Sequence, residues 1–176
     1  HILSYALAGT FPRSLTHGDT RLLQDPKNLH EHHIVVQKIK DKMLEKSPQV
    51  QIGETGIMAL KNVFHLRTLL STVDTSNSLI EWAKHLHPTP ALGGQPSKAA
   101  LDFLRVNEKH ERGLYAAPLG LIDAQGDGTL IVAIRSALFD GKTCYAYAGC
   151  GIVAASDCQA EFDETKIKLK TILEAL

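Results

Sequence analysis

A run rich in proline and glycine near the middle of the chain limits how the polypeptide can fold around it. In "HPTPALGGQPS", Pro88 and Pro90 impose extended backbone on the residues that precede them. Gly93 and Gly94 permit a positive φ or the close approach of a ligand to the backbone. Amphipathic helices are predicted on both sides, and Ser97 is in position to cap the second of them. Judged from this pattern alone, the run is either a connecting loop or a loop that lines a binding site.

Helical and extended patterns follow each other along the chain without regular alternation. This order favours an α+β fold, with antiparallel sheets flanked by helices. Asp25 and Pro26 mark the start of one helix, as its cap and its first residue. The glycine-containing turns after residue 113 predict an antiparallel meander of three strands. Helices are predicted for residues 25–46, 76–87, 97–110 and from 161 onward, and strands or extended segments for 1–10, 50–73 and 113–154.

The balance of charge argues against two classes of partner. The 176 residues contain 19 Lys and Arg and 19 Asp and Glu, so no basic excess exists to attract nucleic acid or an acidic membrane surface. No apolar run approaches the roughly 20 residues that a membrane helix needs. Cys144, Cys150 and Cys158 form an odd set without C-x-x-C spacing, which is typical of reduced thiols in a cytoplasmic protein.

Acidic side chains on two predicted helices are candidates for a cation site. Glu161, Glu164 and Lys168 share one stripe of the C-terminal helix, at spacings of three and four residues. Glu31 precedes apolar residues at helical spacing, so it points toward the buried side of its helix. Inward carboxylates must be paired or bind a metal, and two of them on separate helices suit a hard cation that prefers oxygen ligands. For the C-terminal stripe, the alternative is a solvated Glu–Lys pair.

Three other motifs contain residues that are common in functional sites. The "HEHH" sequence at 30–33 suggests zinc, but neighbouring helical positions do not face together and no cysteine motif accompanies it. The "DGKT" sequence at 140–143 is similar to the end of a phosphate-binding loop, but it joins two predicted strands and is expected to be a hairpin turn. Arg135 is expected on one face of a strand, where it either binds a ligand carboxylate with two hydrogen bonds or forms an edge salt bridge.

The order of motifs along nearly the whole chain resembles the chorismate-utilising enzymes, and within that family most closely the isochorismate synthases. The motifs are "ALAGTFPR", "DPKNLHEHHIVV", "NVFHLRT", "LHPTPALGGQP", "RGLYAAPLGLID", "GDGTLIVAIRSAL", "YAGCGIVAASD" and "EFDETKIKLK". The resemblance implies that residues 1–176 form the C-terminal part of a chorismate-binding domain with an anthranilate synthase-like fold.

The resemblance also implies roles for individual residues. Mg²⁺ would be held by Glu31 and Glu164, with Glu161 binding directly or through water. Chorismate and isochorismate would be the ligands, and His65 would lie close to the ring and its leaving group. The implied substrate-binding residues are Thr10, Ala91, Leu92, Arg135, Gly149, Cys150, Gly151 and Lys168. We therefore expect the two glutamates to converge on one cation site, and the Arg and Lys to face the turn at 149–151.

The proline–glycine run resembles the loop that lines the ring-binding pocket in this family. Anthranilate-forming relatives carry a Thr where this chain has Ala91, and an Ala there resembles the enzymes that deliver water, not ammonia, to the ring. The implied reaction is a Mg²⁺-dependent attack of water on C2 of chorismate with loss of the C4 hydroxyl, which needs a base for the water and an acid for the leaving group.

The family's base, a Lys, and its acid, a Glu in an "SPE"-like motif, lie upstream of the strand that opens this chain. The chain also begins inside a predicted strand without Met. We therefore expect a fragment of a longer protein, inactive by itself and able to self-associate through uncovered strands.

Two alternatives to an isochorismate synthase stay open at this point. One is a salicylate synthase, which adds pyruvate elimination to the same first step, although Ala91 argues against it. The other is a ligand-binding remnant without catalysis. For an isochorismate synthase, the sequence is compatible with either menaquinone or siderophore biosynthesis.

Overall fold

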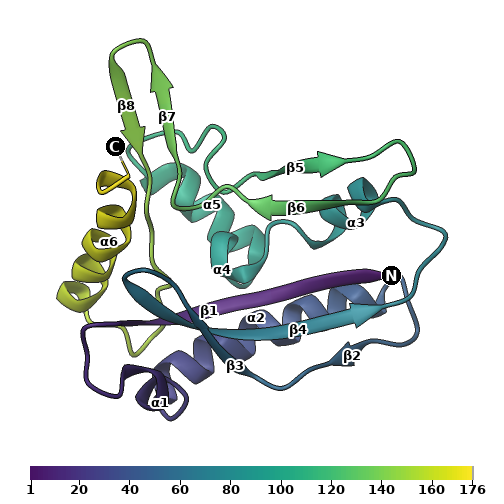
Figure 1. Ribbon diagram of the computed structural model, residues 1–176, viewed down its shortest axis with the longest axis horizontal. Helices are drawn as coiled ribbons and strands as arrows, with labels where there is room; N and C mark the ends of the chain where they lie inside the picture. Colours follow the sequence, from purple (N-terminus) through teal and green to yellow (C-terminus); the bar gives the residue numbers. More distant parts are fainter. Residues whose placement is uncertain (176) are drawn as a thin grey trace.

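The structure, a computed structural model, describes residues 1–175. Its first half is a four-stranded antiparallel sheet centred on β4 (Val63–Thr72). β1 (Ile2–Pro12) pairs with one edge of β4, and the short strands β2 (Gln51–Ile52) and β3 (Gly56–Ala59) pair with the other. In Figure 1, β1 and β4 run side by side across the centre, and α2 (Pro26–Leu44) lies along them.

The main core lies between this sheet and α2. Side chains of β1 alternate in burial, so Ala6 and Ala8 are buried whereas Leu3, Tyr5 and Leu7 on the opposite face are exposed. The residues that α2 buries recur at helical spacing, as the periodicity predicted. The cluster consists of Ala6, Ala8, Val35, Ile39, Met43, Leu70 and Trp82. One face of the sheet is therefore covered by α2.

The start of α2 confirms the prediction made from its sequence. Pro26 is the first helical residue, and the Asp25 carboxylate accepts a hydrogen bond from the Asn28 backbone N–H at 2.8 Å. The Asn28 side chain in turn accepts a hydrogen bond from the Thr10 backbone N–H at 2.9 Å, which ties the helix to β1. A short helix, α1 (Gly18–Leu22), precedes it in a segment for which no helix was predicted, and it buries Leu22.

The proline–glycine run is bounded by helices, as predicted, but one turn inside it is also helical. α3 (Leu79–Leu86) begins with a capping box formed by Ser78 and Glu81. α4 (Pro90–Gly93) is a single turn that starts at a proline and ends before Gly94, which has a φ of 73°. Of the two possibilities that these glycines permit, a positive φ is observed at Gly94.

Two details of the next helix, α5 (Ser97–Asn107), differ from the prediction. Pro96 occupies the capping position without a side-chain hydrogen bond, and Ser97 is the first helical residue instead of the cap. The helix also ends at Asn107 rather than at residue 110, because the backbone is extended at Glu108.

The predicted three-stranded meander was wrong, because four strands form two separate hairpins. β5 (Pro118–Ile122) pairs with β6 (Gly128–Val132), and β7 (Ala137–Asp140) pairs with β8 (Thr143–Ala146). The alternating pattern runs on past Val132, but the backbone leaves the sheet at residues 133–136, where Arg135 has a φ of 50°. The "DGKT" sequence forms the turn of the second hairpin, as expected.

The last helix, α6 (Cys158–Leu173), begins three residues earlier than predicted. The Asp157 carboxylate caps it by accepting a hydrogen bond from the Ala160 backbone N–H at 2.9 Å. Figure 1 places α6 at the side of the molecule where β1 ends and α2 begins. The C-terminal helix is thereby brought close to the end of β1 and the start of α2.

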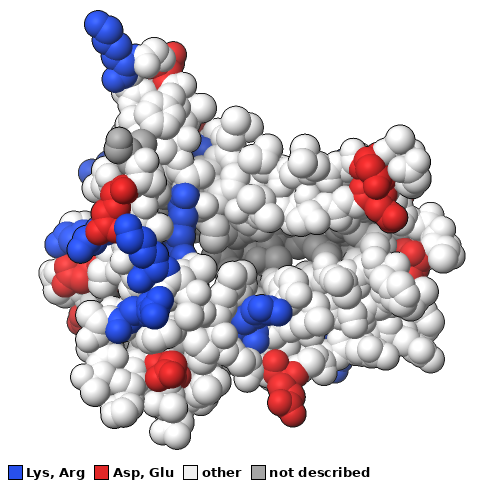
Figure 2. Space-filling view, in the orientation of Figure 1, with Lys and Arg blue, Asp and Glu red and all other residues white. Residues whose placement is uncertain are grey.

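Charges of both signs are mixed around α6. Figure 2 shows basic and acidic side chains interleaved on that side of the face in view, with no continuous basic surface on this face. Of the helices in residues 1–175, none combines the length and the apolar character needed to cross a bilayer.

Gly94 offers a test of the backbone in the proline–glycine run. A Cβ at this residue would lie 2.6 Å from the Ala100 Cβ, and its positive φ disfavours L side chains. We expect Gly94→Ala to lower the free energy of unfolding by about 1–3 kcal/mol. Gly56→Ala is the matched control, since a Cβ there meets nothing within 4 Å. Urea unfolding followed by circular dichroism measures both, and equal stability of the two variants would contradict this account.

Candidate active site

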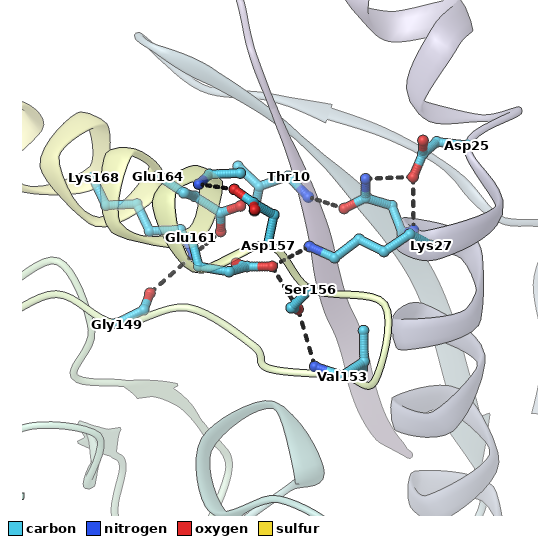
Figure 3. Close-up of polar contacts among 12 residues, drawn as sticks. Thr10, Asp25, Lys27, Gly149, Val153, Ser156, Asp157, Glu161, Glu164 and Lys168 are labelled. Atoms are coloured by element: carbon cyan, nitrogen blue, oxygen red, sulfur yellow. Dashed lines mark hydrogen bonds and ion pairs between the residues drawn. The ribbon is translucent and has the colours of Figure 1, made fainter.

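A cluster of charged side chains forms where α2, α6 and the loop before α6 meet. Figure 3 shows Lys27 extending from α2 toward Glu161 on α6, with Glu164 and Lys168 on the same helix. A cavity of about 430 Å³ lies beside them, and Thr10, Lys27, Asn28, Glu161 and Glu164 are among its lining residues. The cluster joins residues that are far apart in the sequence.

Glu161 is the most deeply buried carboxylate in the cluster, with 4% of its surface exposed. Its Oε1 accepts hydrogen bonds from Lys27 Nζ at 2.6 Å and from Ser156 Oγ at 2.6 Å. Burial raises the pKa of this carboxyl, but these two hydrogen bonds and the Lys27 charge outweigh that effect, so the pKa lies below its ordinary value. Its Oε2 is buried and has no hydrogen-bond partner in residues 1–175.

Glu31 lies one helical turn after Lys27 and faces inward, as predicted from the sequence. Burial raises the pKa of its carboxyl, Lys27 opposes the rise, and the negative charge of Glu164 adds to it. A Cβ on Gly151 would meet the Glu31 carboxylate, so the turn at 149–151 passes directly beside this side chain.

Glu164 and Lys168 form an ion pair at 2.6 Å along α6, and both side chains are largely buried. The ammonium of Lys168 also donates a hydrogen bond to the Gly149 carbonyl at 3.0 Å. The alternative interpretation of this stripe as a solvated pair is therefore wrong, since the pair faces the 149–151 turn. The structure does bring Lys168 to that turn, as the sequence predicted.

The carboxylates of Glu31, Glu161 and Glu164 all lie near the Lys27 ammonium. Glu164 raises the pKa of Glu31, and Lys27 is attracted to all three carboxylates. In residues 1–175, no three His, Cys, Asp or Glu side chains are gathered into a group that could hold a metal ion by themselves. Two of the glutamates are instead held by lysines, at 2.6 Å in each case.

The donor atoms of this cluster nevertheless suit a hard cation. All of them are carboxylate oxygens, and the buried Oε2 of Glu161 lacks a partner among the described residues. Mg²⁺ is commonly bound by one or two carboxylates and completes its octahedron with waters and substrate oxygens. The residues that could hold it are Glu31, Glu164 and, through Oε2, Glu161.

His65 lies at the edge of this cluster, where β1 and β4 pair. Its Nδ1 is 3.0 Å from the Gly9 carbonyl and 3.1 Å from Thr10 Oγ1. A carbonyl only accepts, so Nδ1 carries the proton and donates to Gly9, and Nε2 is left as an acceptor. Burial and the positive charge of Arg135 lower the pKa of His65 to about 4. The imidazole is therefore neutral at pH 7.

Arg135 reaches the site by a route that its sequence did not predict. The expectation that it lies on the face of a strand was wrong, because its positive φ places it in the turn between the two hairpins. From there its guanidinium donates to His65 Nε2, and it is near enough to be attracted to Glu164. Burial lowers the pKa of this guanidinium.

Cys150 lies between the two glycines of the 149–151 turn. Burial and the nearby charges of Glu161 and Glu164 raise the pKa of its thiol to about 11. It therefore stays protonated at neutral pH and is no nucleophile.

Ala91 and Leu92 lie in α4, apart from the charged cluster in the sequence. Ala91 is exposed. The Leu92 carbonyl accepts a hydrogen bond from Arg112 Nη1 at 2.7 Å, and Arg112 is itself held by Glu108. This turn packs against α2, and its role in lining a substrate pocket stays a prediction.

The sequence interpretation missed several residues that shape the site. Lys27, Asn28, Ser156 and Arg112 all make contacts described above. Lys27 had one available signal, since it lies four residues before Glu31 and hence on the same face of the helix. Of the histidines in the "HEHH" sequence, His32 is buried and its Nε2 lies 2.8 Å from Thr68 Oγ1, whereas His30 and His33 are exposed.

Comparison with known proteins places this geometry in a family. Residues 1–176 match the family model described as chorismate binding enzyme. The chain belongs to the chorismate-binding enzyme family. The resemblance seen in the motifs is thereby confirmed.

The relatives of this chorismate-binding chain include several isochorismate synthases. It is 42% identical to isochorismate synthase MenF of Bacillus subtilis over 182 residues, covering 99% of this chain and 39% of that protein. It is 40% identical to the salicylate biosynthesis isochorismate synthase of Pseudomonas aeruginosa, covering 99% and 38%. The solved structure of MenF, the menaquinone-specific isochorismate synthase of Escherichia coli, matches with a TM-score of 0.87 at 28% identity, over 97% of this chain and 41% of that one.

These matches confirm the predicted fold class. Mixed helices and antiparallel sheets are arranged as in solved isochorismate synthases. The chain spans about two fifths of the length of the curated relatives named above.

The lowered pKa of His65 predicts how stability depends on pH. Because the folded-state pKa is about 4 and the ordinary value is 6.5, the unfolded chain binds more protons between these two pH values. The stability contribution of neutral His65 is therefore complete above pH 6.5 and falls as the pH decreases toward 4. We expect the free energy of unfolding to decrease more steeply over this window than in His65→Gln. Parallel slopes in urea titrations at several pH values would contradict the assignment.

Proposed function

We propose that the full-length protein converts chorismate to isochorismate in a Mg²⁺-dependent reaction. The observation that carries the proposal is the alignment of 99% of the chain with isochorismate synthases. The carboxylates of α2 and α6 support it, because Glu161 is buried and the cluster lies close to a neutral histidine and a half-buried arginine. In this proposal, water adds to C2 of chorismate as the C4 hydroxyl leaves and the double bond moves.

The cation part of the site is assigned to Glu31 and Glu164, with Glu161 contributing through Oε2 or a water. Carboxylate oxygens are the ligands that Mg²⁺ prefers. When bound, the ion would supply a Lewis acid that neutralises the carboxylate on the substrate ring. The neighbouring Gly151 has a role of its own, since a larger residue would displace Glu31.

The anion part of the site is assigned to Arg135, Lys168 and the backbone of 149–151. A guanidinium binds a carboxylate through two charge-assisted hydrogen bonds, whereas an ammonium acts as a point charge. Lys168 already contacts the turn through the Gly149 carbonyl, and Arg135 lies against His65. Thr10 contacts His65 through Oγ1, which places its hydroxyl at the same edge.

His65 is assigned to orientation of the substrate and not to proton transfer. Its Nδ1 proton is held by Gly9, and its pKa of about 4 makes it a poor base at neutral pH. Proton transfer is therefore assigned to groups other than His65. Ala91 is proposed to favour water as the nucleophile, because an Ala in this loop resembles the family members that deliver water, and not ammonia, to the ring.

The reaction itself is tested with the full-length protein, chorismate and Mg²⁺. We expect isochorismate as the product, identified by chromatography against an authentic standard. Activity should disappear when the metal is removed with EDTA and return when Mg²⁺ is added. Release of salicylate with pyruvate would identify a salicylate synthase, and chorismate binding without turnover would favour a non-catalytic ligand-binding protein.

Substitution of the assigned cation ligands tests the site. Glu31→Gln and Glu164→Gln each keep the size of the side chain but remove one charged oxygen ligand. We expect kcat to fall by about 10²-fold or more, because charge stabilisation of the transition state is lost. Glu54→Gln changes an exposed residue between β2 and β3 and should leave kcat unchanged. If all three variants keep full activity at low Mg²⁺ concentration, the assigned ligands are wrong.

A further inference from the structure

Lys27 occupies the point where α2 meets α6. Its Nζ lies 2.6 Å from Glu161 Oε1, and the two residues are 134 positions apart in the sequence. The Lys27 side chain is 26% exposed and that of Glu161 is 6% exposed, so the pair is shielded from solvent mainly on the Glu161 side. Figure 3 shows the lysine bridging the two helices. None of the roles assigned above uses this contact.

The charge of Lys27 acts on the whole carboxylate cluster and not on Glu161 alone. Glu31 is one helical turn away on α2, and the ammonium attracts Glu31 and Glu164 as well as Glu161. With Lys168 paired to Glu164 and the Arg135 guanidinium attracted to the same carboxylate, three negative charges face three positive ones. The cluster is therefore close to neutral, which is little for binding a divalent cation.

The hydrogen bond from Lys27 also determines which oxygen of Glu161 can bind a cation. Oε1 accepts from both Lys27 and Ser156, so Oε2 is the oxygen that remains for a ligand. The Ser156 hydroxyl is held in turn by the Val153 backbone N–H at 3.1 Å, so the carboxylate is fixed from two sides.

We propose that Lys27 is a positioning residue and a built-in counter-cation: it holds Glu161 by Oε1 and weakens the binding of a free divalent cation to the cluster. This inference rests on the cation site of the proposed function. Removal of the ammonium leaves the cluster with about one net negative charge and removes a repulsion on the incoming ion. Affinity for a free cation should then increase.

The test measures binding of Mn²⁺, as a spectroscopic probe for Mg²⁺, to the full-length protein without chorismate. Electron paramagnetic resonance of free Mn²⁺ gives the dissociation constant directly. We expect Lys27→Met to bind at least about tenfold more tightly than the wild type, and Lys27→Arg to bind like the wild type. Lys170→Met is the matched control, since Lys170 pairs only at 3.6 Å with Glu174 on the exposed side of α6.

A second pair of variants covers the case in which Lys27→Met does not fold because Glu161 is left buried and unpaired. Glu161→Gln removes that charge, so Glu161→Gln and the double variant Lys27→Met/Glu161→Gln differ only in the ammonium. The double variant should bind Mn²⁺ at least about tenfold more tightly than Glu161→Gln alone. A purely structural role for Lys27 would not increase affinity in either comparison.

The outcomes separate this inference from the proposed function. If the wild type binds Mn²⁺, Glu31→Gln does not, and loss of Lys27 leaves affinity equal or lower, the role of Lys27 is overturned while the cation site stands. If the wild type does not bind Mn²⁺ at millimolar concentration and forms no isochorismate, the proposed cation site is overturned and the inference falls with it.

Discussion

The site depends on one irregularity in the pairing of β1 with β4. The register shifts between Ala8 and Thr10, so Gly9 is an extra residue in the ladder, with a φ of 75°. A Cβ on Gly9 would lie 3.1 Å from the Asn28 Cβ and 3.2 Å from a methyl group of Leu66, so α2 and the sheet leave no room for a side chain. Only glycine combines this conformation with this proximity.

The bulge sets the direction of two groups that the site uses. The Gly9 carbonyl points toward His65 and accepts a hydrogen bond from its Nδ1–H. The Thr10 backbone N–H points toward the Asn28 side chain at the start of α2. Asn28 is next to Lys27, which holds Glu161 on the last helix. A backbone irregularity in the first strand is thus linked by hydrogen bonds to the carboxylates of α2 and α6.

Sequence patterns predicted correctly those features that depend on residues close together in the chain. The start of α2 followed from Asp25 and Pro26, and the inward direction of Glu31 followed from the apolar residues that come after it. The strand pattern after Gly128 was misleading, because alternation of apolar residues continues through Arg135 while the backbone turns out of the sheet. Side-chain spacing does not report a positive φ in a non-glycine residue.

The candidate site was harder to predict, because its contacts join distant parts of the chain. Periodicity indicated which way Glu31 and Glu164 face, but only the resemblance to a family implied that they act together. Lys27 was missed since its partner is 134 residues away, and no spacing rule connects the two. The same limit applies to His65, whose partner Arg135 is 70 residues distant.

The contact between His65 and Arg135 connects the bulge at Gly9 to the charges of the site. Two cations in contact would repel each other, so this arrangement requires a neutral imidazole, and burial together with Arg135 provides it. The Gly9 carbonyl selects the tautomer with the proton on Nδ1, which leaves Nε2 free to accept from the guanidinium. Arg135 is then oriented without loss of its positive charge. Gly9 in the first strand therefore fixes the tautomer of His65, and His65 in turn orients Arg135, the residue assigned to bind an anionic ligand.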